Sequence, residues 1–246
     1  MTPYPAETEL LEHYWKGQRR VEKMAREYAG DFMKADIRKK ILDSGVSVCP
    51  SICISRKIGV GAIEVGQILG DRLGLKVLDR EIIEQISNSA ALRSQSIETF
   101  DERYPGKIKE FMCVILGDRA FNMTDYAREL FYAAFCLAHM EPNIFIGRGI
   151  HLMLPRDRVF AVRFVSSEKR RIKRIAASLK INEQKAARVL NQAEEEQMKF
   201  FKIVHQKDSA PADEFDLVMN MDYIDDPQAA AEAIDILFKR RFPEVK

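Results

Sequence analysis

Two glycines, Gly59 and Gly61, stand between an apolar, β-branched run at residues 46–55 and an amphipathic helical pattern that starts near residue 62. In open parallel sheets, ligands bind at such turns, and glycines allow the backbone N–H groups to close on an anion. The N-terminus of the following helix adds a positive end at the same point. The turn therefore indicates a phosphate cradle, with a plain tight turn as the alternative. The candidate cradle consists of Ser55, Arg56, Lys57, Gly59, Val60, Gly61 and Ala62.

The cradle departs from the regular phosphate-binding loop, GxxxxGK[ST]. No lysine follows Gly61, and no serine or threonine stands beside it to hold Mg²⁺. The cations close to the turn in sequence are Arg56 and Lys57, at its front. Either of them can supply positive charge, although not from the usual place in the loop.

Charged residues also follow the next two predicted strands. Asp79 and Arg80 come directly after the strand at 75–78, and Arg148 follows the strand at 143–147, between two glycines. The planar guanidinium of Arg148 matches two phosphate oxygens, and its alternative role is that of a surface arginine. Asp79 suits a ribose hydroxyl, a water-mediated contact to Mg²⁺, or the cap of the next helix.

A basic cluster over 169–174 opens a predicted helix that Ser166 or Ser167 caps. Arg171 and Arg174 are three residues apart, so they share a helix face and can act on one anion together. A solvated basic helix is the alternative. Asn182 is predicted to cap a further helix that runs to about residue 205.

The remaining patterns predict one α/β domain behind a helical extension. Helices are expected at 6–43, 80–90, 97–103 and 124–140, strands at 158–165 and 215–220, and a last helix from Asp226-Pro227 to about residue 241. Alternation of strands and helices predicts parallel strands. Residues 104–122 fit no clear pattern.

The segments Ile54-Ser55-Arg56-Lys57-Ile58-Gly59-Val60-Gly61, Leu78-Asp79-Arg80-Glu81 and Ile146-Gly147-Arg148-Gly149, with the basic helix after them, resemble the cytidylate kinase-like family of P-loop proteins. The resemblance covers about residues 50–240. It implies a P-loop NTPase-like three-layer sandwich with a five-stranded parallel sheet over 46–241, a lid at about 166–206, and an N-terminal helical extension at 1–45. The implied activity moves the γ-phosphoryl group of ATP to a nucleotide such as CMP, with Mg²⁺.

The resemblance also implies roles for individual residues. ATP would lie on residues 55–62, and Asp79, Arg80 and Arg148 would hold the acceptor. The lid would close through three cations, Arg171, Arg174 and Lys199. Together with Arg148 these are the implied catalytic residues. Lys57, Val60, Ala62 and Ile63 replace Glu, Ser, Gly and Arg of the family's loop, and Gln197 stands where a lid arginine is expected.

These departures favour a second hypothesis, a non-catalytic nucleotide or phosphometabolite sensor on the same fold that signals through the N-terminal helices. A dinucleotide-dependent oxidoreductase fits less well, because Glu64 stands at the third glycine position of GxGxxG.

Composition narrows the class of protein further. The 246 residues carry 39 basic and 37 acidic side chains, a net charge of +2, so nucleic acid is not expected as a partner. No signal peptide or apolar run of membrane-spanning length is apparent, which predicts a cytoplasmic protein without membrane contact. Histidines and cysteines lack ligand spacing, so no protein-built metal site is expected. The apolar stripe of the extension predicts packing on the domain, a homodimer or a partner contact.

Overall fold

The computed structural model describes residues 48–80, 83, 112, 116, 120, 123–208 and 210–245. The predicted extension at 6–43 lies outside these residues. So do the helices expected over 80–103, except for Arg80 and Ile83, and most of the unassigned stretch 104–122.

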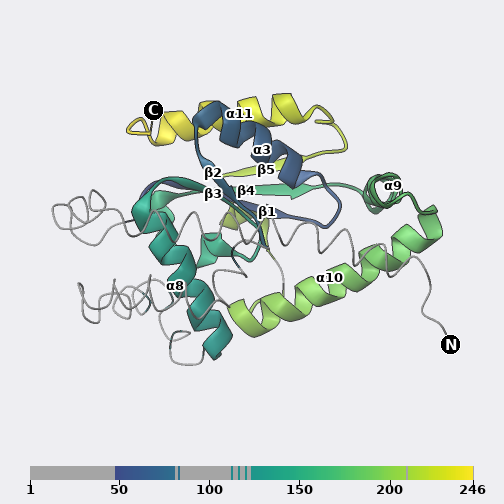
Figure 1. Ribbon diagram of the computed structural model, residues 1–246, viewed down its shortest axis with the longest axis horizontal. Coiled ribbons are helices and arrows are strands. Elements are labelled where there is room, and N and C mark those ends of the chain that lie inside the picture. The colour runs from purple at the N-terminus through teal and green to yellow at the C-terminus, as the bar shows by residue number, and fades with distance from the viewer. Residues whose placement is uncertain are drawn as a thin grey trace.

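Five parallel strands form one sheet in the order β2-β3-β1-β4-β5, as Figure 1 shows. The strands are β1 (Ser51–Arg56), β2 (Lys76–Leu78), β3 (Asn143–Ile146), β4 (Val159–Val165) and β5 (Leu217–Asn220). Strands β1, β3 and β4 are almost wholly buried, because both faces of the sheet are covered. The predicted five-stranded parallel α/β fold is confirmed.

Helices cover the two faces of the sheet as outer layers. Helices α3 (Ala62–Leu73) and α11 (Pro227–Arg241) lie on one face, and α8 (Asp125–Met140) and α10 (Glu183–His205) lie on the other (Figure 1). Helix α9 (Glu168–Leu179) stands at the end of the sheet toward which β4 points. Short 3₁₀ helices occupy Ile150–Leu152, Arg156–Arg158 and Ala212–Glu214.

Alternation along β1 divides the core into two clusters. Ile52 and Ile54 pack with Leu69 of α3 and Phe238 of α11. Cys53 points to the opposite face and packs with the α8 cluster. Because side chains alternate along a strand, Ser55 lies on the same face as Cys53, and that face is the one α10 covers.

The helix starts follow the capping signals in the sequence. Ser167 accepts a hydrogen bond from the backbone N–H of Arg170 at 3.4 Å, and Asn182 accepts one from Lys185 at 2.9 Å. Asp226 caps α11 with Pro227 as its first residue. Of the two serines that the sequence allows as the cap of α9, the structure therefore uses Ser167. Within the part of the chain that the structure describes, no helix is long and apolar enough to cross a membrane.

Candidate functional site

The turn between β1 and α3 has the backbone expected of an anion cradle. Gly59 and Gly61 have φ angles of 77° and 90°, in the left-handed region that favours glycine. Lys57 anchors the front of the turn, since its backbone N–H donates to the carbonyl of Phe164 at 3.2 Å. No side chain caps the start of α3 at Gly61. The N-terminal N–H groups of α3 are therefore placed to meet a ligand.

Helix α9 packs directly on this turn. A Cβ atom on Gly59 would stand 3.0 Å from Cδ1 of Ile175 and 3.2 Å from the carbonyl oxygen of Arg171. We predict that Gly59→Ala lowers the free energy of unfolding by about 1–3 kcal/mol, because alanine is strained at this φ and crowds a backbone atom. Urea unfolding measures the change.

Gly74 provides a matched control for this substitution. It has a similar φ of 65°, but a Cβ atom there would meet nothing within 4 Å. Gly74→Ala therefore carries the conformational cost alone, about 1 kcal/mol. Equal losses in the two variants would contradict close packing of the turn on α9.

Arg171 joins the cradle to α10. Its side chain is buried, and its guanidinium donates to the carbonyl of Ile58 at 3.3 Å and to Glu194 Oε1 at 2.5 Å. The sequence predicts Arg171 as a lid cation. The structure places it between the turn and α10, where Glu194 neutralises its charge.

Arg174 lies over the mouth of the cradle. Its Nη2 would be 2.7 Å from a Cβ atom on Gly61, and it donates to Glu64 Oε2 at 3.0 Å. Both side chains are about half exposed, so water screens this ion pair. Arg174 is thus the predicted lid cation that reaches the glycines. Lys199 is exposed on α10 and lines neither of the two pockets described below.

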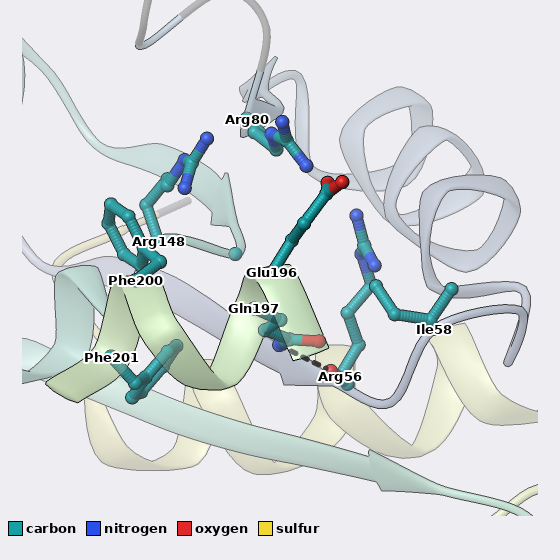
Figure 2. Close-up of a pocket in the computed structure, with 9 residues that line it drawn as sticks. Arg56, Ile58, Arg80, Arg148, Glu196, Gln197, Phe200 and Phe201 are labelled. Carbon is teal, nitrogen blue, oxygen red and sulfur yellow. Dashed lines mark hydrogen bonds between the residues drawn. The ribbon is translucent and has the colours of Figure 1, made fainter. Parts of the chain in front are cut away.

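A pocket at the carboxyl edge of the sheet gathers three arginines from three elements. Arg56 ends β1, Arg80 follows β2, and Arg148 follows β3. Figure 2 shows their side chains around the space above α10, with the carboxylate of Glu196 directed between Arg80 and Arg56. The cavity volume is about 70 Å³, room for a phosphate group.

The Gly147-Arg148-Gly149 turn has three successive positive φ angles, 92°, 53° and 66°. Arg148 is not a glycine, so its left-handed backbone is strained, and such strain gathers at functional sites. Its guanidinium carbon lies 4.0 Å from the centre of the Phe200 ring, a cation–π contact. Its carbonyl oxygen lies 2.7 Å from Nε2 of His205, which must donate there. Helix α10 therefore contacts Arg148 at two points, the guanidinium group through Phe200 and the backbone carbonyl through His205.

Asp79 follows β2, and its carbonyl accepts the backbone N–H of Ile83 at 3.1 Å. This backbone hydrogen bond places Asp79 at the start of a helical turn, and the three roles predicted for its side chain stay predictions. Asp79 does not line the arginine pocket, whereas Arg80 does.

Glu194, Phe200 and His205 were not assigned a role from the sequence. Each lies on α10, and each contacts a predicted site residue from a distant part of the chain. The sequence holds a weak indication for Glu194, because it is an acidic residue on the helix that follows the basic helix, so an ion pair between the two helices could be expected. The sequence holds no such indication for Phe200 and His205, because an aromatic residue on an amphipathic helix is expected to pack in the core.

The described residues fit a polyphosphate better than they fit Mg²⁺. The uncapped start of α3 and the two positive-φ glycines suit a phosphate, and Arg174 stands over them. For the metal, the hydroxyl of Ser55 already accepts a hydrogen bond from Arg163. Asp79 supplies a carboxylate at the same edge of the sheet.

His151, two residues after Gly149, is buried beside Phe215 with a ring separation of 4.8 Å. Burial, with the charges of His205 and Lys207 nearby, lowers the pKa of His151 from 6.5 to about 3. Glu214 lies 3.5 Å away but also pairs with Lys207, so it does not keep the imidazole charged.

The unfolded chain therefore takes up a proton at His151 below pH 6.5, and the native state does so only near pH 3. The free energy of unfolding must fall as the pH drops through this window. We predict that His151 contributes about 1 kcal/mol of loss between pH 6 and pH 5. Urea unfolding at both pH values should show a smaller difference for His151→Gln; an equal difference would contradict a neutral His151.

A parallel α/β sheet with a glycine turn after its first strand and arginines at its carboxyl edge is the arrangement expected of a kinase-like α/β protein. The sequence matches the cytidylate kinase-like family over residues 51–223, and the chain belongs to that family. The resemblance drawn from the sequence motifs is thereby confirmed.

One solved structure supports the fold, and a second is reported as a weaker match. An uncharacterized protein from Eubacterium ventriosum superposes with a TM-score of 0.58 at 14% identity, covering 77% of this chain and 98% of that one. Shikimate kinase from Bacteroides thetaiotaomicron has a TM-score of 0.38 at 12% identity and covers 77% and 96% of the two chains. No curated protein matches the sequence.

Proposed function

We propose that the protein is an ATP-dependent phosphotransferase of the nucleoside monophosphate kinase type, acting on a phosphorylated small acceptor. The observation that carries the proposal is the convergence of Arg56, Arg80 and Arg148 on one pocket beside the glycine turn. A cluster of guanidinium groups at the carboxyl edge of a parallel sheet suits a phosphate ester.

Phosphoryl transfer asks a protein mainly for positioning and for neutralisation of charge. The backbone N–H groups of the 55–62 turn that follow Lys57 hold the donor phosphates, because the N–H of Lys57 itself donates to the carbonyl of Phe164. Arg148 and Arg80 hold the phosphate of the acceptor. ATP and Mg²⁺ supply the transferable phosphoryl group and its counter-charge. Arg174 moves from Glu64 to the donor phosphates, while Arg171 keeps α9 on the turn.

A coupled assay tests the proposal. Purified protein is incubated with ATP, Mg²⁺ and each nucleoside monophosphate in turn, and formation of the nucleoside diphosphate is followed. Turnover with at least one acceptor supports a kinase. Absence of turnover with every acceptor contradicts it.

The second candidate is a non-catalytic nucleotide sensor, which three features of the site favour. The turn has no lysine after Gly61, Arg174 is paired with Glu64 across its mouth, and Gln197 donates to the carbonyl of Arg56 where a lid arginine is expected. Loss of preorganised cations acts directly on the rate of phosphoryl transfer. Thermal stabilisation by ATP without turnover selects the sensor.

We propose further that the protein works in the cytoplasm, where nucleotides are available.

We also propose that residues 1–45 contact a second copy of the chain or a partner. Deletion of residues 1–44 tests this contact. A truncated chain with unchanged stability and unchanged association state, by analytical ultracentrifugation, contradicts it.

A further inference from the structure

A second hollow lies between β4, the front of the glycine turn and α10. Its cavity volume is about 380 Å³, within the range of small-molecule sites. Arg56, Gln197 and Phe201 line both this hollow and the arginine pocket, so the two adjoin. The remaining lining residues are Lys57, Arg163, Glu194, Met198, Asp208 and Ala210.

Arg163 is an unusual residue for its position. It lies within β4, whose other residues are apolar, and it pairs in register with Ser55 on β1. Its Nη1 donates to Ser55 Oγ at 2.5 Å, and its guanidinium carbon lies 5.7 Å from the centre of the Phe215 ring. Among the described residues, no carboxylate pairs with it. A half-buried guanidinium without an anion carries a cost in desolvation, and this burial also lowers the pKa of Arg163.

Lys57 adds a second positive charge to the same hollow. It is half-buried, and no described carboxylate lies within ion-pair distance of it. The two acidic residues of the lining are engaged elsewhere, because Glu194 pairs with Arg171 and Asp208 pairs with Lys202. The hollow therefore holds two positive charges that the described part of the chain does not neutralise.

We propose that this hollow binds a small organic anion, separate from the acceptor of the arginine pocket and from the donor phosphates that the backbone of the glycine turn holds. Arg163 and Lys57 hold its oxyanion group, a phosphate or a carboxylate. Phe201, Met198 and Ala210 provide an apolar wall for its body. The combination of two cations with one apolar wall matches the composition of small-molecule sites.

Phenyl phosphate and benzoate serve as probes, with inorganic phosphate and benzyl alcohol as partial probes that each lack one half of the ligand. Calorimetry on the full chain at low salt measures affinity and stoichiometry. We expect Arg163→Met to weaken one binding event at least about tenfold, as loss of a charged partner does. Lys57→Met weakens the same event. Stronger binding of phenyl phosphate or of benzoate identifies the oxyanion.

Arg148→Gly is the matched control, because Arg148 lines the arginine pocket and not this hollow. We expect Arg148→Gly to change the affinity of the binding event that depends on Arg163 by no more than about twofold. This expectation holds even if the kinase proposal fails. Thermal unfolding separates a ligand-holding residue from a structural one. Because no described carboxylate neutralises this guanidinium, its removal keeps or raises the Tm of Arg163→Met. A lower Tm with unchanged affinity, or no binding of either anion, overturns the proposal, and Lys57→Met decides it if Arg163→Met does not fold.

Discussion

Arg148→Gly is expected to lower the rate of phosphoryl transfer by a factor of about 10²–10³ while leaving the fold intact. The guanidinium of Arg148 is held in place before any ligand arrives, by the Phe200 ring at 4.0 Å and by the His205 contact to its backbone. Removal of one preorganised donor costs about 2.7–4 kcal/mol in the transition state, which gives this factor. Steady-state assays with the best acceptor measure it.

Glycine is the informative replacement at this position because the φ of residue 148 is 53°. Alanine would combine loss of the charge with backbone strain, whereas glycine accepts this φ freely. Its free energy of unfolding should stay within about 1 kcal/mol of that of the parent. Arg148→Lys keeps a charge but not the planar fork, and should recover only part of the rate. An unaltered rate in Arg148→Gly would remove Arg148 from the site.

The second large effect concerns the ion pair between α9 and α10. We expect Glu194→Ala to reduce the free energy of unfolding by about 3 kcal/mol, because it leaves the buried guanidinium of Arg171 without its carboxylate. The value belongs at the low end of the range for buried pairs, since 38% of the Glu194 side chain is exposed and water can approach. Urea unfolding measures the loss.

A double variant separates the two charges from their packing. Arg171→Met with Glu194→Leu removes both charges at similar volume, and such replacements are often neutral. We expect it to be more stable than Glu194→Ala by most of the 3 kcal/mol. Hydrogen exchange in α9 shows whether the helices separate before the domain unfolds. Equal free energies of unfolding for Glu194→Ala and the double variant would mean that Arg171 and Glu194 are not energetically coupled.

The sheet, the cradle and the strand-end arginines could be predicted because each rests on a local signal. A β-branched run, a glycine turn and an amphipathic helix define β1 and α3 within a short segment, and the cap residues of α9, α10 and α11 mark their starts. Arg80 and Arg148 follow from the rule that parallel strands end at the same edge.

The partners of the lid cations could not be predicted, because they depend on how α9 and α10 cross each other and the turn. The sequence predicts Arg171 as a cation for the ligand, yet Glu194, 23 residues later, neutralises it. Arg174 meets Glu64 across 110 residues. Arg163 is different, because a single charge in an apolar strand is visible in the sequence and is expensive to bury.

Helix α10 is one unbroken element of 23 residues, about 34 Å long. Its middle contacts Arg171 and the carbonyl of Arg56, and its last turn holds the carbonyl of Arg148. A straight helix transmits displacement along its whole length. Under the proposed function, the donor and acceptor sites both contact α10, so a tilt of this helix that releases one product also disturbs the binding of the other, and the two ligands bind with linked affinities.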